Sequence, residues 1–188
     1  MLPAVFIDRD DTLIRNNDLP VPTHPPANWK PGDLYDPVRV KLMPGALEAC
    51  RVLHDAGFVL IIVTNQGCVA RGSATIAQVA AVNRRVRELL VTETNRGMIR
   101  AVYSVPFHPK GDVPGFTREH PWRKPSGGML RQAARDLGLN LSRSWLIGDA
   151  HRDVEAGIHA GLPEAHCLRC GPEGAHPSVL DAAQSIPV

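Results

Sequence analysis

Two carboxylates directly follow the first apolar segment of the chain, and their position suggests metal and phosphate chemistry. The run 4–7 is typical of a buried strand, and Asp8 and Asp10 come after it. Residues two apart in an extended backbone point the same way, so both would lie beyond the strand's carboxyl end, where open α/β sheets bind ligands. Paired carboxylates repel unless a cation lies between them, and Mg²⁺ takes oxygen ligands together with water and substrate phosphate. The alternative is a polar turn after a strand.

Three later segments also place polar groups at the ends of expected elements. They are Thr64, Asn65 and Gln66 after the apolar run 58–63, Arg123 and Lys124 before an expected helix, and Asp149 and Asp153 after the apolar run 145–147. Because the carboxyl ends of parallel strands meet at one edge of a sheet, these side chains are expected to face the first acidic pair.

The order of these groups resembles that of the haloacid dehalogenase (HAD) superfamily of phosphotransferases. The four motifs of that superfamily are D-x-D-x-T, a strand-terminal Thr or Ser, a Lys, and G-D-x-x-x-D. Two longer strings, T-N-Q-x-x-x-A-R-G at 64–72 and R-K-P-x-x-G-M at 123–129, are similar to the histidinol-phosphate and heptose-bisphosphate phosphatase branch. The resemblance spans nearly the whole chain.

The resemblance implies Mg²⁺-dependent phosphomonoester hydrolysis through an aspartyl-phosphate on Asp8. Asp10 would protonate the leaving oxygen and then activate the hydrolytic water. Thr64 would donate a hydrogen bond to the transferred group, and Lys124 would supply compensating charge. The implied metal ligands are the Asp8 side chain, the Asp10 backbone carbonyl and Asp149, with Asp153 supporting that site.

Four further residues are expected to bind substrate by the same resemblance: Asn65, Gln66, Arg71 and Arg123. Two guanidiniums can bind a second anionic group bidentately, so a small sugar bisphosphate similar to heptose 1,7-bisphosphate is expected. Histidinol phosphate or another small phosphomonoester, a nucleic-acid 3′-phosphate, and a non-catalytic scaffold are the alternatives. The two arginines equally fit a surface or loop-shaping role.

Strand patterns alternate with helix patterns along the chain, which predicts an α/β fold. Strands are expected near residues 4–8, 58–63, 100–104, 144–147 and 165–169, and helices at 45–56, 75–94, 126–137 and 152–160, with a short terminal helix after 171. Such alternation favours right-handed crossovers and a Rossmann-like three-layer sandwich around a parallel sheet. No segment is long enough for a large inserted cap, so only minimal loop caps are expected.

Length and composition agree with one phosphatase domain over residues 1–188. Of the 188 residues, 44% are hydrophobic and 21% are charged, which is ordinary for a globular domain. A formal net charge of +2 is too small to indicate a nucleic-acid partner. The chain has no apolar run of about 18 residues, so no membrane span is expected. The expectation is a cytoplasmic monomer that acts on a small phosphorylated metabolite and keeps its cysteines as free thiols.

Residues 14–44 form the first of two long loops. The segment is rich in proline and follows the paired acids directly, so it is expected to be a lid or specificity loop. Trp29 and Tyr35 are its expected anchors. A disordered spacer is the alternative.

The second loop, 105–122, usually carries a structural zinc in the related branch. The four aligned ligand positions are Val105, Phe107, His120 and Trp122 in this chain. One imidazole cannot hold a tetrahedral zinc, so no structural zinc is expected. Apolar packing of Phe107, Phe116 and Trp122 is expected to close the loop instead.

The first motif departs from the family at Asp11, where the family commonly has Gly. If that turn requires a positive φ, Asp is one of the few other residues that tolerate it. A small geometric cost with intact chemistry is expected.

Overall fold

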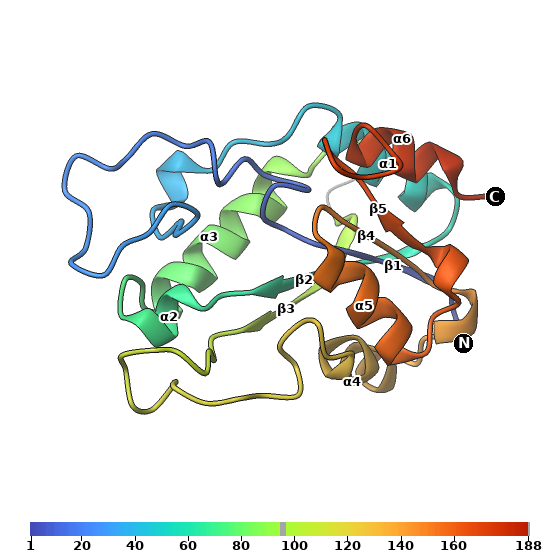
Figure 1. Cartoon of the computed structure of the whole chain (residues 1–188). Helices are drawn as coiled ribbons and strands as arrows, with labels where there is room; N and C mark the ends of the chain where they lie inside the picture. The colour runs from blue at the N-terminus through green and yellow to red at the C-terminus, as the bar shows by residue number, and fades with distance from the viewer. Residues whose placement is uncertain (95–96, 188) are drawn as a thin grey trace.

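A five-stranded sheet forms the centre of the molecule, in the strand order β3-β2-β1-β4-β5 (Figure 1). The computed structural model describes residues 1–94 and 97–187, so positions 95, 96 and 188 of the predicted domain lie outside the described residues. The strands are β1 (Ala4–Ile7), β2 (Val59–Asn65), β3 (Ile99–Val105), β4 (Trp145–Gly148) and β5 (Cys167–Arg169). All neighbouring strands pair in parallel, which confirms the predicted sheet.

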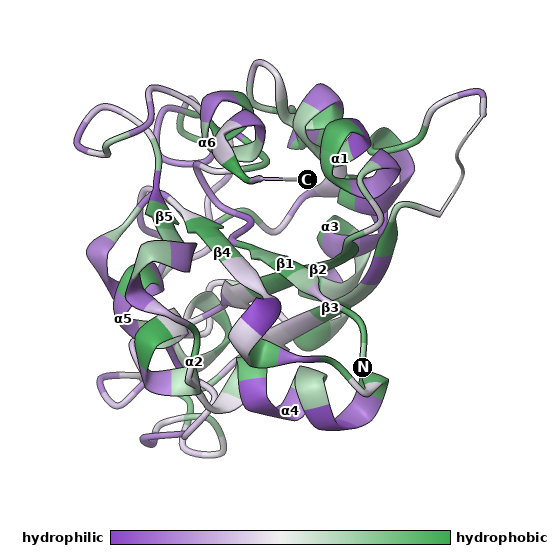
Figure 2. Cartoon of the chain, turned by 90° about the vertical axis from the view of Figure 1, so that its right-hand side faces the viewer, coloured by the Kyte–Doolittle hydropathy of each residue, from purple (hydrophilic) through white to green (hydrophobic). Residues whose placement is uncertain are grey.

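Helices cover both faces of this sheet, as predicted. They are α1 (Ala46–Asp55), α2 (Cys68–Arg71), α3 (Ile76–Leu89), α4 (Gly128–Leu137), α5 (His151–Ala160) and α6 (Val179–Ser185). One core cluster joins α1, α3 and α6 to the sheet, and a second joins α4 and α5 to its other face. Figure 2 shows α1 and α6 on one side of the strands and α4 and α5 on the other.

The central strand β1 is buried on both faces. Val5 and Ile7 pack into the first core cluster, whereas Ala4 and Phe6 pack into the second. Such two-sided burial gives a continuous apolar run instead of an alternating one. From β1 the chain adds β2 and β3 on one side of the sheet and then β4 and β5 on the other, so the topological switch point lies between β1 and β4. Ligands bind at such switch points in open α/β sheets.

Helix α3 is shorter than the sequence predicts. It begins with a capping box between Thr75 and Gln78 and ends at Leu89, whereas the helix was expected to continue to residue 94. Leu90 already leaves helical geometry at φ −91° and ψ 53°, and the β-branched Val91 and Thr92 that follow favour helix less than extended backbone. The short helix α2 was not predicted.

The loop 14–44 contains one 3₁₀ turn, Pro37–Arg39, and an isolated antiparallel bridge between Ile14 and Leu42, and is otherwise irregular. The predicted anchors both make contacts within the described chain: Tyr35 packs against a small cluster that contains Cys68 and Val69, and Trp29 Nε1 donates to the carbonyl of Asp33. Asp11 adopts φ 58°, and its Oδ1 accepts the backbone N–H groups of Asn16 and Asn17. Asp11 therefore holds the start of this loop as well as tolerating the turn.

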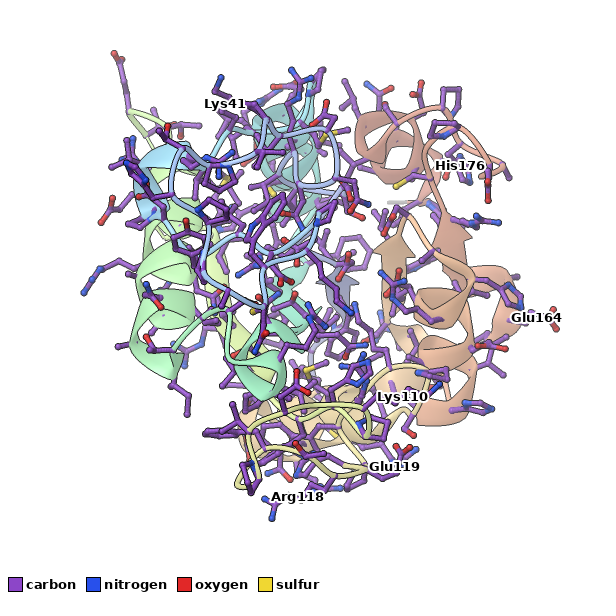
Figure 3. All side chains as sticks on the ribbon, turned by 60° about the vertical axis from the view of Figure 1, so that its left-hand side comes forward. Lys41, Lys110, Arg118, Glu119, Glu164 and His176 are labelled. Atoms are coloured by element: carbon purple, nitrogen blue, oxygen red, sulfur yellow. The ribbon has the colours of Figure 1, made fainter. Side chains whose placement is uncertain are left out.

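Aromatic packing closes the second loop, as predicted. The Phe107 ring stacks on His120 with centroids 4.6 Å apart and contacts Phe116 at 5.8 Å. His120 in turn meets Trp122 edge-on at 5.8 Å. Arg118 covers the outer side of Phe107, 4.1 Å from the ring centroid, at the edge of the molecule (Figure 3). Three of the four positions that align with zinc ligands, Phe107, His120 and Trp122, thus carry rings that pack against one another.

No helix among residues 1–94 and 97–187 is long and apolar enough to cross a membrane.

Candidate active site

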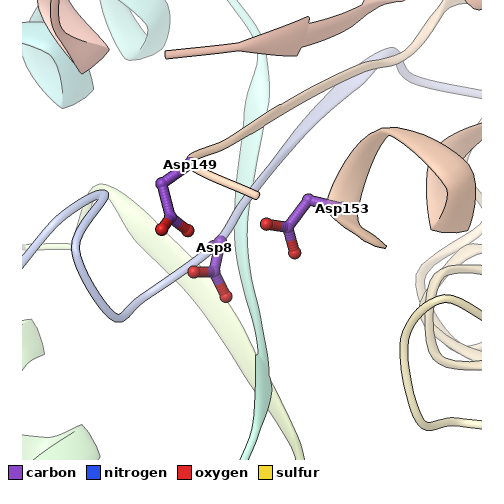
Figure 4. Close-up of side chains that lie close together, drawn as sticks. All are labelled: Asp8, Asp149 and Asp153. Atoms are coloured by element: carbon purple, nitrogen blue, oxygen red, sulfur yellow. The ribbon is translucent and has the colours of Figure 1, made fainter. Parts of the chain in front are cut away.

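The carboxyl ends of β1 and β4 bring three carboxylates together at the switch point of the sheet. Asp8 follows β1, Asp149 follows β4, and Asp153 lies in the first turn of α5. One oxygen from each lies within 4.8 Å of the other two (Figure 4). The backbone N–H of Asp8 donates to the carbonyl of Ile147 at 2.9 Å, which continues the β1–β4 ladder to the site.

Lys124 supplies the positive charge inside this cluster. Its ammonium forms an ion pair with Asp8, lies 2.6 Å from a carboxylate oxygen of Asp153 and donates to the carbonyl of Val63 at 3.0 Å. The residue is only 2% exposed. Burial lowers the pKa of Lys124, but the charges of Asp8 and Asp153 outweigh this effect and raise it overall. The lysine is therefore held in its charged form between two acids.

The cluster carries more negative charge than Lys124 can balance. Burial raises the pKa of Asp8 to about 8, with Lys124 acting in the opposite direction and the other acids adding to the rise. Burial followed by the charge of Asp153 raises the pKa of Asp149. Asp8 Oδ2 and Asp149 Oδ1 are buried and accept no hydrogen bond from the described part of the chain. An oxygen-only donor set with unpaired buried lone pairs fits a hard divalent cation such as Mg²⁺.

Asp10 belongs to a second group of side chains beside this cluster. The Arg9 guanidinium binds both of its oxygens, with Nε to Oδ1 at 3.0 Å and Nη2 to Oδ2 at 3.1 Å. Gln66 Nε2 donates to Oδ2 at 2.8 Å, and the Thr64 hydroxyl approaches the same oxygen at 3.4 Å. The carboxylate of Asp10 therefore faces three donor side chains.

Both polar atoms of the Asn65 side chain bind the backbone of Lys124. Its side-chain oxygen accepts the N–H of Lys124 at 3.0 Å, and its amide nitrogen donates to the Lys124 carbonyl at 3.0 Å. This reciprocal pair joins the end of β2 to the segment that carries the buried lysine. Asn65 is thereby placed to fix the position of Lys124 in addition to the substrate contact expected of it.

A cleft of about 310 Å³ opens next to both groups. Its lining residues are Asp10, Asp11, Asn16, Asn17, residues 31–33, Asn65, Gly67, Arg71, Arg123 and Arg152. The cleft thus combines carboxylate, amide and guanidinium side chains.

The two predicted substrate arginines are held differently. Arg71 forms an ion pair with Asp33, whose side chain is 2% exposed and also accepts the Ser73 hydroxyl at 2.6 Å. This pair ties the loop 14–44 to α2. Arg123 Nη1 donates to the carbonyl of Phe107 at 3.1 Å, which ties it to the second loop. Burial, and then the charges of Arg152 and Arg71, lower the pKa of Arg123.

Sequence reasoning missed Arg9, Asp33 and Arg152. A charged residue inside the string Asp8-Arg9-Asp10, between two acids at a buried strand end, was a signal that could have found Arg9. Arg152 similarly lies inside the G-D-x-x-x-D string. Asp33 carried no local signal, because its partner Arg71 is distant in the sequence.

The fold and this site define a HAD-like hydrolase. A family model described as HAD-hydrolase-like matches residues 121–168, which include Lys124, Asp149 and Asp153. A crystal structure of a HAD-like phosphatase from Mesorhizobium loti superposes with a TM-score of 0.77 at 35% identity, covering 92% of this chain and 74% of the other. The D,D-heptose 1,7-bisphosphate phosphatase from B. bronchiseptica, complexed with magnesium and phosphate, has the same fold, with a TM-score of 0.75 at 23% identity over 97% of both chains.

The chain belongs to the family of D-glycero-D-manno-heptose-1,7-bisphosphate 7-phosphatases, and it is a phosphatase. It is 37% identical over 163 residues to the D-glycero-beta-D-manno-heptose-1,7-bisphosphate 7-phosphatase of Mesorhizobium japonicum, which covers 87% of this chain and 68% of that protein. The enzyme of the same name from Yersinia pestis is 31% identical over 171 residues, covering 90% of this chain and 82% of the relative.

Proposed function

We propose that this phosphatase hydrolyses a small sugar bisphosphate of the heptose 1,7-bisphosphate kind, through an aspartyl-phosphate on Asp8. The observation that carries the proposal is the buried cluster of Asp8, Lys124, Asp149 and Asp153 beside a cleft lined by arginines. The names of the relatives support the substrate class.

Asp8 is the proposed nucleophile. Lys124 holds its Oδ1, whereas no donor among the described residues binds its Oδ2. A carboxylate that Lys124 holds in a fixed orientation is suited to in-line attack on phosphorus, because phosphoryl transfer depends mainly on positioning and charge neutralisation. The new bond joins Asp8 to phosphorus as the bond to the leaving alkoxide breaks.

Asp10 is the proposed acid and base. In the first step it gives a proton to the departing alkoxide, and in the second it takes one from the water that hydrolyses the aspartyl-phosphate. Its carboxylate lines the cleft and is 17% exposed, so it can reach a bound substrate. Thr64 donates toward Asp10 here, and a further contact from Thr64 to the transferred phosphoryl group remains the role proposed for it.

The side chains of Asp8 and Asp149 and the carbonyl of Asp10 would hold Mg²⁺, which when bound supplies positive charge beside the transferred phosphoryl group. Asp153 supports these ligands by orienting Lys124, and its Oδ2 accepts the N–H of Ala150 at 3.0 Å at the start of α5.

The cleft supports a substrate with two phosphate groups. Arg71, Arg123 and Arg152 all line it, and close guanidiniums repel one another unless an anion lies between them. Asn65, which lines the cleft, and Gln66, which binds the cleft-lining Asp10, stay proposed substrate contacts. A sugar with a second phosphate would bring an anion to Arg123 and Arg152, whereas Arg71 is already paired with Asp33.

A phosphate-release assay of the purified chain tests this proposal. The assay compares four kinds of substrate, each in the presence of Mg²⁺ and in EDTA: sugar bisphosphates, the matching monophosphates, histidinol phosphate and 3′-phosphorylated oligonucleotides. We expect the highest kcat/KM on a bisphosphate, loss of activity in EDTA and recovery with Mg²⁺. Equal rates on all the esters would contradict the substrate class, and activity in EDTA would contradict the metal site.

A further inference from the structure

Arg9 is an arginine buried beside the catalytic carboxylates without lining the cleft. It is 1% exposed and is among the largest fully buried side chains of the described chain. Its position between Asp8 and Asp10 places it at the end of β1, where the strand enters the site. Burying a guanidinium carries a large desolvation cost unless hydrogen bonds and an opposite charge satisfy it.

Two partners satisfy the guanidinium. Nε and Nη2 bind the two oxygens of Asp10 in a bidentate pair, and Nη1 donates to the side-chain oxygen of Asn83 at 2.7 Å. Asn83 belongs to α3, so this contact joins the helix to the end of the central strand. The bidentate geometry fixes the orientation of a carboxylate more strictly than a single hydrogen bond.

The partners of Arg9 border a second, larger groove. Asn83 and Gln66 line a groove of about 700 Å³ between α3 and β3. Gln66 Nε2 donates to Asp10 Oδ2 at 2.8 Å, so the groove side supplies a further donor to the same carboxylate. Because Asn83 lines this groove, shortening its side chain enlarges the groove and does not leave an enclosed cavity in the core.

We propose that Arg9, oriented by Asn83, is a positioning residue that holds the Asp10 carboxylate in the direction needed for proton transfer. This inference rests on the proposed function, in which Asp10 is the acid and base. Arg9 contacts Asp10 and not the cleft, so it acts through Asp10 and leaves the binding of the substrate phosphate to other residues. Its removal therefore affects kcat and leaves KM unchanged.

The test compares Arg9→Met and Asn83→Ala with the parent on two esters, an alkyl phosphate and an aryl phosphate with a good leaving group. The alkyl ester needs protonation of its leaving oxygen, so we expect its kcat to fall about ten- to hundredfold, and that of the aryl ester to fall much less. KM and inhibition by inorganic phosphate should stay within about twofold of the parent. In an Asp10→Asn background, Arg9→Met should cause no further loss, because its effect passes through Asp10.

Ser144→Ala is the matched control for stability. Ser144 is also fully buried and accepts the N–H of Ala4 at 2.9 Å, at the opposite end of β1 from the site. Ser144→Ala should lower Tm but should not change the ratio of kcat on the alkyl ester to kcat on the aryl ester. If Arg9→Met does not fold, Arg9→Lys and Asn83→Ala decide the question. Arg9→Lys keeps a cation near Asp10 but loses the bidentate pair, and Asn83→Ala keeps Arg9 but removes the side chain that orients it.

Three results would overturn the positioning role: equal losses on both esters, a raised KM as the main effect, or an additional loss in the Asp10→Asn background. An Asp10→Asn enzyme as active as the parent would instead overturn the acid–base assignment in the proposed function. The two failures are thus distinguishable.

Discussion

Replacing Asp149 with Asn should stabilise the metal-free protein while removing its response to Mg²⁺. The oxygens of Asp8, Asp149 and Asp153 lie within 4.8 Å of one another, and one pair of like charges at that distance costs about 3 kcal/mol at an effective dielectric constant of about 20. Lys124 offsets part of this repulsion by binding Asp8 and Asp153, but it forms no ion pair with Asp149 in the described chain. We therefore expect a net gain of about 1–2 kcal/mol, which corresponds to a Tm increase of roughly 2–8 °C for a domain of this size.

The same substitution should change the pH dependence of stability. Burial, then Asp153, raise the folded-state pKa of Asp149 above its ordinary value of 3.8. Between that value and the raised pKa, the folded parent binds more protons than the unfolded chain, so its stability rises as pH falls through this window. The variant lacks this titration, and its advantage over the parent should shrink as the pH is lowered.

Thermal melts in EDTA and in Mg²⁺ measure both effects. The parent should gain about 2.7 kcal/mol at a Mg²⁺ concentration of about 100 times Kd, and Asp149→Asn should gain far less. Asp112→Asn is the control, because it removes the same charge from an exposed position outside the cleft lining. A metal-free Tm below that of the parent, together with an unchanged Mg²⁺ response, would refute the view that Asp149 is an unbalanced metal ligand.

The remaining predictions concern activity and composition. Asp8→Asn should abolish turnover with an unchanged circular dichroism spectrum, because an amide cannot attack phosphorus; activity within about tenfold of the parent would contradict the covalent route. Asp10→Asn should be impaired least on esters with good leaving groups, as a series of aryl phosphates would show. Elemental analysis after dialysis should find no stoichiometric zinc, and one zinc per chain would reveal an unrecognised site. Arg123→Ala and Arg152→Ala should each lower kcat/KM about ten- to hundredfold more on a bisphosphate than on the matching monophosphate, since a charge-assisted pair contributes about 1.5–3 kcal/mol. Arg71→Ala should in addition lower Tm, because it breaks the buried pair with Asp33.

The sequence by itself determined the sheet and the convergence of the main site residues. Apolar runs with polar ends predicted each strand to within a few residues, because a parallel strand buried on both faces must be apolar along its length. Parallel strands end at a common edge, so Asp8 and Asp149 were expected to meet there. The structure places them within the same carboxylate cluster. This part of the site depends on where each apolar run ends and on which polar residues follow it, and both are local features of the sequence.

Only the tertiary structure decided what the partner side chains contact. Asn65 binds the backbone of Lys124, Arg71 binds Asp33 from the first long loop, and Arg9 reaches Asn83 on α3. These contacts join residues 38 to 74 positions apart. A residue type and its neighbours in the sequence cannot specify which of several distant groups a long polar side chain will meet, because that choice depends on the packing of loops and helices around the sheet. The strand ends are local in origin, whereas the hydrogen bonds that orient the proposed catalytic groups exist only once the chain has folded.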